Sequence, residues 1–323
     1  MPQHQWSSRR IRVEDAGDGV LIAYLGSDEL GLFRREDGPE FFDLVERADR
    51  DPAVRAVVFT GTHPERFISH ADLGWLQEDG AAIPPVGRRI TNVVVKIGHQ
   101  LNRHKFTRWI ASKTPLTGAV QLDRVHATLT LISTSSTIFV AALNGTALGF
   151  GAEISWACDL RLMADGDYSI GHLEVLLGFP PGGGGTQRLP LLIGTHRALV
   201  AILEGRPFPA KEALEVGAID EIVAPDQLLS RAVERARYLA ARPTEAIGAI
   251  KRAVNAGTSL TMAKGLELEG TEFLALLPHA QAQEIMLRYV RETAENGELP
   301  LYQPDGYATA LQNGAAVDIT SRK

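Results

Sequence analysis

The sequence contains a single cysteine, Cys158, among 323 residues. One thiol excludes an intramolecular disulfide and fits a reducing compartment, so we expect a cytoplasmic protein. Because Cys158 lies among apolar residues, we expect a buried structural thiol rather than a nucleophile.

Long hydrophobic runs and an excess of positive charge are also missing. No stretch of 18 or more uninterrupted apolar residues could cross a membrane, and no apolar segment of a secretory signal follows the opening MPQHQWSSRR. The net charge of -6 and the pI of about 5.9 argue against a general nucleic-acid binder. The chain is 45% hydrophobic and 22% charged, as in ordinary globular proteins, and is long enough for a sizeable core.

The first half of the chain alternates between strand-like and helix-like segments. Residues 20–24 and 55–61 are apolar strand-like runs, and the helix-like segment 41–48 lies between them. Further strands are expected at 137–143, 159–164 and 168–170. This order predicts an α/β layer architecture.

From about residue 196 onwards, helix-like segments follow one another. Residues 227–236 keep apolar side chains on one helical face, and 244–256 and 260–277 continue this pattern. The tail is rich in Pro, Gly, Asn and Gln, and we expect it to be loosely attached. The predicted sections are a core of residues 1–205 with an insertion at 74–118, a helical section of residues 206–295, and a tail of residues 296–323.

The insertion contains a basic segment within an acidic protein. Between Arg88 and Lys113 the sequence holds seven Lys or Arg and no Asp or Glu. One interpretation is a solvated helix face. The other is a patch that contacts phosphates or an acidic partner surface.

A carboxylate follows a pair of glycines in the segment ALGFGAE, residues 147–153. If a helix begins here, its first N–H groups lack partners and its dipole is positive at this end, which suits an oxygen that develops negative charge. Gly149 and Gly151 would let a ligand approach the backbone closely, and Glu153 would lie in the first turn. The spacing excludes a GxGxxG dinucleotide motif, because position 154 is Ile.

A second carboxylate, Glu174, lies between Leu173 and Val175. These apolar neighbours predict a poorly solvated acid with a raised pKa. Either glutamate alone is more often a surface or salt-bridged residue, but two partly buried carboxylates near backbone donors could form an acid–base site. The His172-Leu173-Glu174 spacing could suggest a metal ligand set, but no further His or Cys lies nearby, so we expect no metal.

Several segments resemble the crotonase (enoyl-CoA hydratase/isomerase) superfamily. The two signature segments are NGTALGFGAEISWACDLRLMA and SIGHLEVLLGFPPGGGGTQRLPLLIG, residues 144–164 and 169–194. The resemblance covers most of residues 15–290 and includes RAVVFTG and RFISHADL, and later GRPFPAKEALEVGAIDEIV and AIGAIKRAVNAG.

The resemblance implies a fold, an assembly and a substrate class. The fold is a spiral of ββα turns with a helical C-terminal section that packs trimers, often paired into hexamers. The substrate is an acyl thioester of coenzyme A, so coenzyme A is part of the substrate and no separate cofactor is expected. No nucleic-acid or membrane partner is expected.

The resemblance also implies roles for individual residues. The N–H groups of Ala71 and Phe150 would form an oxyanion hole, with Phe150 in place of the usual glycine. Glu153 and Glu174 would hold one water for addition across the 2,3 double bond, and the presence of both favours hydration. The other residues expected to contact the substrate are His70, Asp72, Leu73, Gly149, Gly151, Gly182 and Gly183.

Three departures from the family pattern bear on the substrate. His70 stands in place of a glycine, Leu173 in place of a proline, and the stretch from Asp72 to Asn144 is long. His70 either packs or hydrogen-bonds beside its loop, or it titrates near neutral pH and assists catalysis. The alternatives to a hydratase are an isomerase, a thioester or carbon–carbon hydrolase, or a non-catalytic subunit with the same fold.

Overall fold

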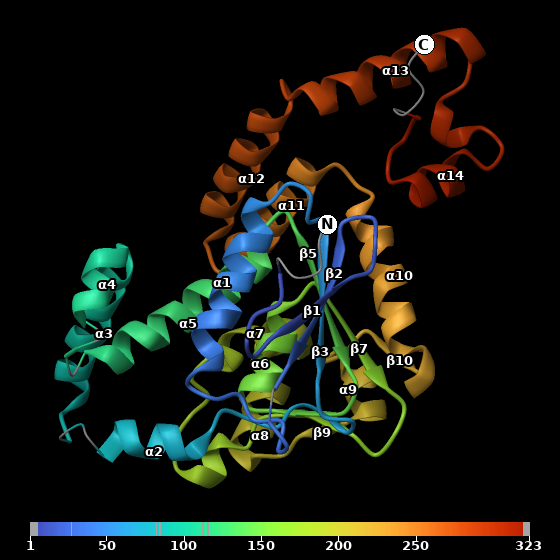
Figure 1. The fold of residues 1–323 in the computed structure, drawn as a ribbon. Helices are drawn as coiled ribbons and strands as arrows, with labels where there is room; N and C mark the ends of the chain where they lie inside the picture. Colours follow the sequence, from blue (N-terminus) through green and yellow to red (C-terminus); the bar gives the residue numbers. More distant parts are fainter. Residues whose placement is uncertain are drawn as a thin grey trace.

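The computed structural model of the protein describes residues 6–26, 28–81, 83, 85–111, 113–114 and 116–318. Its strands form two sheets (Figure 1). The larger sheet has the order β1-β2-β3-β5-β7-β10, with β1 at Arg12–Asp15, β2 at Val20–Leu25, β3 at Ala56–Gly61, β5 at Ile138–Leu143, β7 at Leu160–Ala164 and β10 at Glu221–Val223. The smaller sheet has the order β4-β6-β8-β9, with β4 at Arg66–Ile68, β6 at Thr146–Leu148, β8 at Ser169–Gly171 and β9 at Phe208–Pro209.

The chain passes repeatedly from one sheet to the other. Strand β3 of the larger sheet is followed by β4 of the smaller one, β5 by β6, and β7 by β8. The strands pair in parallel except at two edges, where β1 and β9 pair antiparallel with their neighbours. Each turn of the chain therefore adds a strand to both sheets. This spiral of mixed α/β structure confirms the predicted fold class.

The corner after β5 depends on an Asn-Gly pair. A Cβ on Gly145 would overlap the backbone of the neighbouring turn, and one on Gly61 would overlap the carbonyl oxygen of Arg66. Asn144 fixes this corner, because its Oδ1 accepts the N–H of Gly61 at 2.8 Å and its Nδ2 donates to the carbonyl of His63 at 2.6 Å. These contacts bring β6 beside β4.

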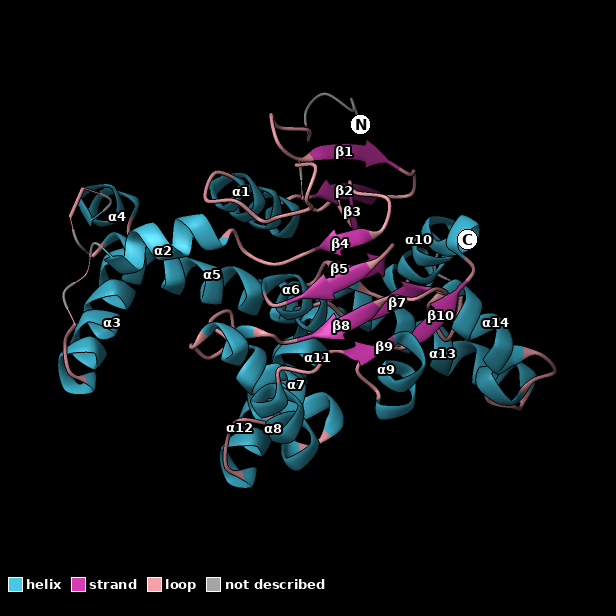
Figure 2. Ribbon diagram, turned by 90° about the horizontal axis from the view of Figure 1, so that it is seen from below, coloured by secondary structure: helices cyan, strands magenta, loops and turns pink. Residues whose placement is uncertain are grey.

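Helices cover both faces of the larger sheet (Figure 2). On one face, α1 (Asp37–Arg50), α5 (Thr117–Thr134) and α6 (Phe150–Ala157) enclose the larger core. On the other face, α10 (Leu228–Ala240) and the start of α11 (Thr244–Gly257) enclose the second core. Alternate residues of β3 enter the two cores, as the pleat of a strand requires. Val57 and Phe59 belong to the larger core, and Ala56 and Val58 belong to the second core.

A buried ion pair ties α11 to the larger sheet. The Nζ of Lys251 lies 2.8 Å from Asp159 Oδ2 and 2.8 Å from the carbonyl oxygen of Thr137, to which it donates. The same carboxylate oxygen accepts the N–H of Phe139 in β5 at 2.8 Å. Because both charges are removed from water, each depends on the other.

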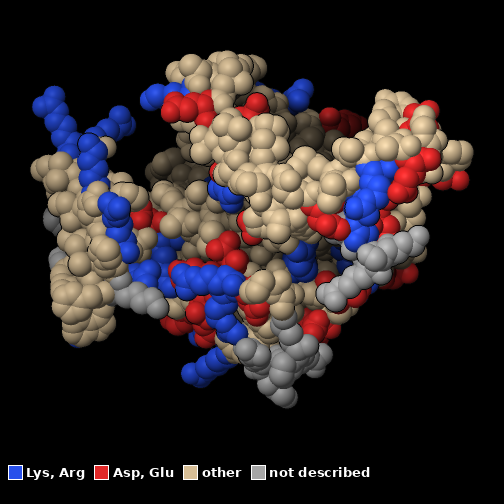
Figure 3. Space-filling model, turned by 90° about the horizontal axis from the view of Figure 1, so that it is seen from above, with Lys and Arg blue, Asp and Glu red and all other residues tan. Residues whose placement is uncertain are grey.

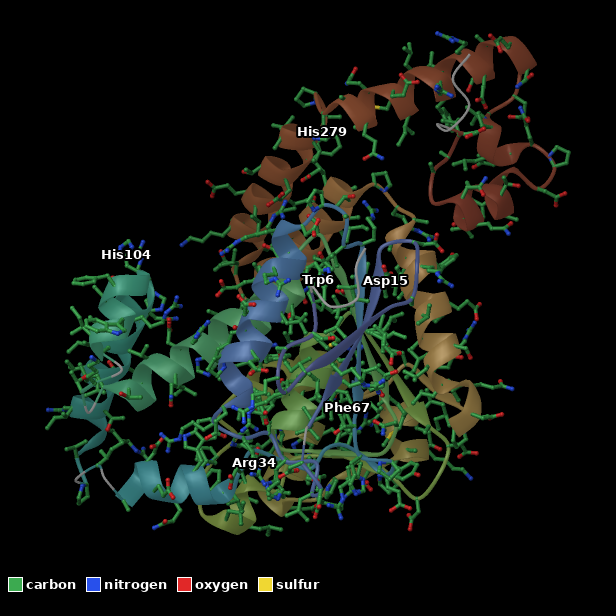
Figure 4. All side chains as sticks on the ribbon, in the orientation of Figure 1. Trp6, Asp15, Arg34, Phe67, His104 and His279 are labelled. Carbon is green, nitrogen blue, oxygen red and sulfur yellow. The ribbon has the colours of Figure 1, made fainter. Side chains whose placement is uncertain are left out.

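The inserted helices lie to one side of the body. They are α2 (Leu73–Ala81), α3 (Arg88–Asn102) and α4 (Lys105–Ala111). Helix α3 packs on α5 where Gly98 faces Ala119, and a Cβ on Gly98 would lie 2.9 Å from the Cβ of Ala119. Figure 4 places His104 at the corner between α3 and α4, away from the buried Phe67.

The C-terminal helices extend away from the body (Figure 1). They are α12 (Met262–Leu276), α13 (Ala280–Asn296) and α14 (Gly306–Asn313), with His279 at the corner between the first two (Figure 4). None of their residues is buried, and Phe273 and Val290 are 62% and 65% exposed. Helix α14 contacts the body, because the carbonyl of Leu311 accepts a hydrogen bond from Arg242. Beyond it the chain lies against α13, where Arg288 donates to the carbonyl of Asp318 at 2.7 Å. None of the described helices is both long and apolar enough to cross a membrane.

The predicted elements agree with the observed ones where the apolar pattern is long. The strands expected at 20–24, 55–61, 137–143, 159–164 and 168–170 are β2, β3, β5, β7 and β8. Helix α1 begins at Asp37 rather than at residue 41, because its first turn is polar and lacks the apolar spacing. The remaining helices are α7 (Gly185–Ile193), α8 (Thr195–Glu204), α9 (Ala210–Val216) and the short η2 (Glu174–Leu177), η3 (Pro225–Gln227) and η4 (Pro300–Tyr302).

Candidate active site

A cavity of about 910 Å³ opens between α1, α2, α5, the start of α6 and the segment 173–183. It brings together residues that lie more than a hundred positions apart in the sequence. Of the residues predicted to form the site, those that line it are His70, Ala71, Leu73, Gly149, Phe150, Glu153, Glu174, Gly182 and Gly183.

Two predicted residues do not line the cavity. Asp72 accepts the N–H of Gly74 at 2.8 Å on its Oδ1 and so supports the start of α2. Gly151 packs against β4, where a Cβ would overlap the carbonyl oxygen of Ile68. Both residues therefore support the backbone of the site from outside the cavity.

Two backbone N–H groups that line the cavity have no acceptor among the described residues. They belong to Ala71 and Phe150. The residues on either side of Ala71 pair with Phe33. The N–H of Phe33 donates to the carbonyl of His70, and the carbonyl of Phe33 accepts the N–H of Asp72, both at 2.9 Å. Phe150 is the first residue of α6, where N–H groups lack intrahelical partners.

The side chain of Phe150 finds room against another aromatic ring. Its ring packs edge-to-face on Phe33, with the centroids 4.7 Å apart. Gly149, which precedes it, has a φ of 50° and lies close to Glu174, because a Cβ there would be 3.1 Å from Glu174 Oε1. A side chain at position 149 would therefore strain the backbone and crowd this carboxylate.

Glu153 is held by the glycine loop that precedes α7 and by the first residue of that helix. Its Oε1 accepts the N–H groups of Gly183 and Gly185, both at 2.8 Å, and its Oε2 lies 2.9 Å from the nitrogen of Gly183. The side chain is buried, and this burial raises its pKa, although nearby His172 and the backbone donors oppose the rise. The loop fixes the carboxylate at the cavity wall.

Glu174 differs from the sequence prediction in its ionisation. Burial favours the neutral acid, but the hydrogen bonds and charge of His172 and the N–H of Leu173 outweigh burial and lower the pKa of Glu174. The His172 Nδ1 lies 3.1 Å from Oε2 and 3.2 Å from Oε1, and the N–H of Leu173 donates to Oε2 at 2.9 Å. The prediction of a raised pKa was wrong, because it counted the apolar neighbours and not the histidine two positions earlier.

His172 is the site residue that the sequence reasoning missed. It is 2% exposed, and its ring packs edge-to-face on Trp156 with the centroids 5.1 Å apart. A Cβ on Gly185 would overlap its Nε2, and this nitrogen has no partner among the described residues. The His-x-Glu spacing was the available signal, but it was weighed only as a metal motif. The described residues contain no group of three His, Cys, Asp or Glu side chains that could hold a metal ion.

His70 hydrogen-bonds within its own loop, and Cys158 is buried in the core. The Nδ1 of His70 lies 2.7 Å from the carbonyl oxygen of Ala71, so the ring hydrogen-bonds beside its own loop, in line with the first of its two interpretations. Cys158 is 5% exposed, and burial raises the pKa of its thiol. The prediction that Cys158 is buried is confirmed.

The basic segment divides between the cavity and the surface. Arg108 of α4 lines the cavity, together with Arg124 of α5 and Arg35. Arg88, Arg89 and Lys96 are exposed on α3 and do not line it. At the left of Figure 3, Lys and Arg side chains project from the inserted helices.

A family model supports the identification of this site. The family described as enoyl-CoA hydratase/isomerase matches residues 111–296, more than half of the chain. The chain belongs to the enoyl-CoA hydratase/isomerase family. Residues 150–183, which contain both glutamates, lie within the matched part of this family member.

Individual relatives of this enoyl-CoA hydratase/isomerase family member agree with the assignment. The chain is 31% identical over 232 residues to the fatty acid oxidation complex subunit alpha of Shewanella loihica, which covers 72% of this chain and 28% of the relative. It is 37% identical over 147 residues to the enoyl-CoA isomerase/hydratase fer4 of Mycosarcoma maydis, which covers 46% of this chain and 54% of the relative. The chain therefore spans only part of the length of these curated relatives.

A solved structure confirms the crotonase fold. An enoyl-CoA hydratase of Geobacillus kaustophilus HTA426 superimposes with a TM-score of 0.71 and 26% sequence identity. The match covers 88% of this chain and 95% of that structure. The family identity and the fold are thus shown together.

Proposed function

We propose that the protein is an enoyl-CoA hydratase, which adds water across the 2,3 double bond of an acyl-CoA thioester. The observation that carries this proposal is the pair of buried carboxylates, Glu153 and Glu174, on the wall of one cavity. In one site, one carboxylate can take a proton from a water molecule while the other supplies a proton to the α-carbon. Family members of this chain include enoyl-CoA hydratases and an enoyl-CoA isomerase/hydratase.

The opposite pKa shifts of the pair suggest separate roles. Glu174, with its lowered pKa, is ionised at neutral pH and takes a proton from the water. Glu153, with its raised pKa, is the group better able to supply a proton to the α-carbon. Environments that push two pKa values apart are what a paired acid and base require. The two groups titrate as a coupled pair, so the assignment states which carboxylate takes up a proton and which one gives up a proton during the reaction.

The thioester carbonyl would bind at the N–H groups of Ala71 and Phe150. Neither group has an acceptor among the described residues, and both line the cavity with the glutamates. Donors that are already in place when an oxygen gains negative charge stabilise the enolate-like intermediate without reorganisation.

The experiment that tests this function measures reaction with a panel of trans-2-enoyl-CoA thioesters. Hydration removes the absorbance of the conjugated double bond, while isomerisation of a 3-enoyl thioester creates it. Hydrolysis instead releases free coenzyme A thiol. Hydration of at least one 2-enoyl thioester supports the proposal, whereas activity only on the 3-enoyl thioester or only thiol release would replace it. Activity should persist in EDTA, since we expect no metal.

The assembly, compartment and pathway are also proposed. We infer a trimer or hexamer, because the exposed apolar side chains of α12 and α13 need a covering surface. The single cysteine and its burial favour action in the cytoplasm. The name of the Shewanella relative suggests a place in fatty acid oxidation.

A further inference from the structure

An arginine on α5, Arg124, forms part of the cavity wall and makes no ion pair with any described residue. The guanidinium carbon of Arg124 lies 4.6 Å from the centre of the Phe42 ring, and Phe42 is itself 5% exposed. The Nε of Arg124 is buried and has no acceptor among the described residues. This guanidinium is therefore half-buried at the cavity wall.

Two further polar groups face the same cavity. Arg108 enters it from the inserted helix α4, and its Nη1 has one weak contact, with Asn102 Oδ1 at 3.5 Å. Gln121 lies one helical turn before Arg124, and its buried Oε1 also lacks a partner in the described part of the chain. Arg108 is close enough that its charge lowers the pKa of Arg124, in addition to the larger effect of burial.

The nearby acids are engaged elsewhere. Asp79 lines the cavity, but it binds Arg35 Nη2 and the indole N–H of Trp75, both at 2.7 Å. On α1, the charges of Glu46 and Asp43 raise the pKa of Arg124, but less than burial and Arg108 lower it. Each of these acids also pairs along its own helix, Glu46 Oε2 with Arg50 Nη2 at 3.4 Å and Asp43 Oδ2 with Arg47 Nη1 at 3.5 Å.

Glu153 and Glu174 are held by backbone donors and His172, as described above. Arg108 and Arg124 thus give this part of the cavity two positive charges, and neither forms an ion pair with an acid among the described residues. Partly desolvated cations of this kind favour a bound anion.

We propose that Arg108, Arg124 and Gln121 form a subsite for a carboxylate carried by the acyl chain, so that the preferred substrates are thioesters of dicarboxylic acids. An arginine fork can bind a carboxylate through two parallel hydrogen bonds, and the Gln121 amide can turn to present its NH2 group. This inference rests on the proposed function, because it assigns the acyl chain to the cavity that contains Glu153 and Glu174.

The phosphates of coenzyme A are the alternative source of negative charge. The pantetheine arm separates them from the thioester carbonyl, whereas Arg108, Gln121 and Arg124 line the same cavity as both glutamates. A subsite that shares the cavity with the reacting carbons, against the buried Phe42, suits the acyl end of the thioester.

The test measures binding of saturated thioesters by calorimetry, so that no reaction is needed. The probes are the glutaric acid monothioester and its methyl ester, each made with coenzyme A and with N-acetylcysteamine, which carries no phosphate. Hydrogen bonds to charged groups contribute about 1.5–3 kcal/mol, so we expect the wild type to bind the free carboxylate at least about tenfold more tightly than the methyl ester. This preference should appear with both carriers.

Substitutions then assign the preference to the subsite. Arg124→Met should abolish it while leaving methyl ester binding within about twofold, since methionine keeps much of the apolar stem. The control Arg103→Met removes an exposed arginine at the end of α3, outside the cavity, and should change neither affinity. If Arg124→Met does not fold, Arg108→Met provides the same comparison.

Two outcomes would overturn the inference. One is a wild type that binds the acid and its methyl ester equally. The other is an Arg124→Met variant that weakens both coenzyme A thioesters alike and neither N-acetylcysteamine thioester, which would place Arg124 on a phosphate. Hydration of an uncharged enoyl-CoA is measured separately. A carboxylate preference without hydration would contradict only the hydratase proposal. Hydration without this preference would contradict only the proposed subsite.

Discussion

Replacing either glutamate with glutamine removes a proton-transfer group while keeping its size. We expect Glu153→Gln and Glu174→Gln each to lower kcat for enoyl-CoA hydration by at least about a hundredfold, because general acid–base catalysis is typically worth about 10²–10⁴-fold. Thioester affinity should survive, since the N–H groups of Ala71 and Phe150 are backbone groups that neither substitution alters.

The structure also predicts a separate cost in stability. Glu153 accepts hydrogen bonds from Gly183 and Gly185, and both of its oxygens are engaged. A glutamine oxygen in place of Oε1 can still accept both N–H groups, but the NH2 group in place of Oε2 then faces the N–H of Gly183, so that one buried N–H of the amide lacks an acceptor. Such a loss costs about 1–3 kcal/mol. Urea unfolding should therefore show this cost, which is independent of the loss in kcat.

The assay combines kcat, the dissociation constant of a saturated thioester and the free energy of unfolding. Glu245→Gln is the matched control, because Glu245 is exposed on α11 and does not line the cavity. The double variant should lose far less kcat than the product of the two single losses, as residues that act as one unit do. Near-normal hydration by Glu174→Gln, in an enzyme whose wild type hydrates the same substrate, would refute the two-carboxylate mechanism.

The pH profile gives a further check on the roles. The basic form of Glu174 is lost as pH falls through its lowered pKa, and the acidic form of Glu153 is lost as pH rises through its raised pKa. The profile of kcat/KM should therefore be bell-shaped. Glu153→Gln should remove the limb at higher pH, and its persistence in that variant would contradict the assignment.

Three other predictions follow from packing. Gly185→Ala should lower kcat strongly, because the new Cβ would overlap His172 Nε2. Gly182→Ala should lower kcat much less, because nothing lies within 4 Å of a Cβ there. Equal effects of the two substitutions in the hydration assay would argue against a role for His172 in holding Glu174. Lys251→Met should lower the free energy of unfolding by about 3–5 kcal/mol, since it leaves the Asp159 carboxylate buried without its partner. Denaturant unfolding measures this loss, with Lys264→Met on exposed α12 as the control. A smaller loss for Lys251→Met would contradict this reasoning. Sedimentation at micromolar concentration should show a trimer or hexamer, and a monomer alone would count against the proposed use of α12 and α13.

The sequence contained enough information for the fold class and for most residues of the cavity wall. Long apolar runs predicted β2, β3, β5 and β7, because a strand buried on both faces has few other possible environments. The position of Glu153 in the first turn of a helix was also predicted, from the glycines before it.

The ionisation of Glu174 could not be predicted in the same way. Its pKa depends on the direction in which His172 points, which the turn after β8 and the contact with Trp156 decide. The proposed carboxylate subsite could not be predicted for a similar reason. Arg108 and Arg124 belong to different helices, and only the packing of α4 beside α5 brings them to one cavity. Side-chain encounters of this kind have no local signature.

The larger sheet is completed from the far end of the chain. Its edge strand β10 comes from residues 221–223, and Arg55 beside β3 donates to the carbonyl of Arg242 at 2.8 Å. A fragment that stops near residue 205 would leave β7 as an open edge and would strip the cover from one face of the sheet. Expression of residues 1–205 should therefore yield an aggregating product, and any fusion or truncation meant to preserve the cavity must retain the helices through α11.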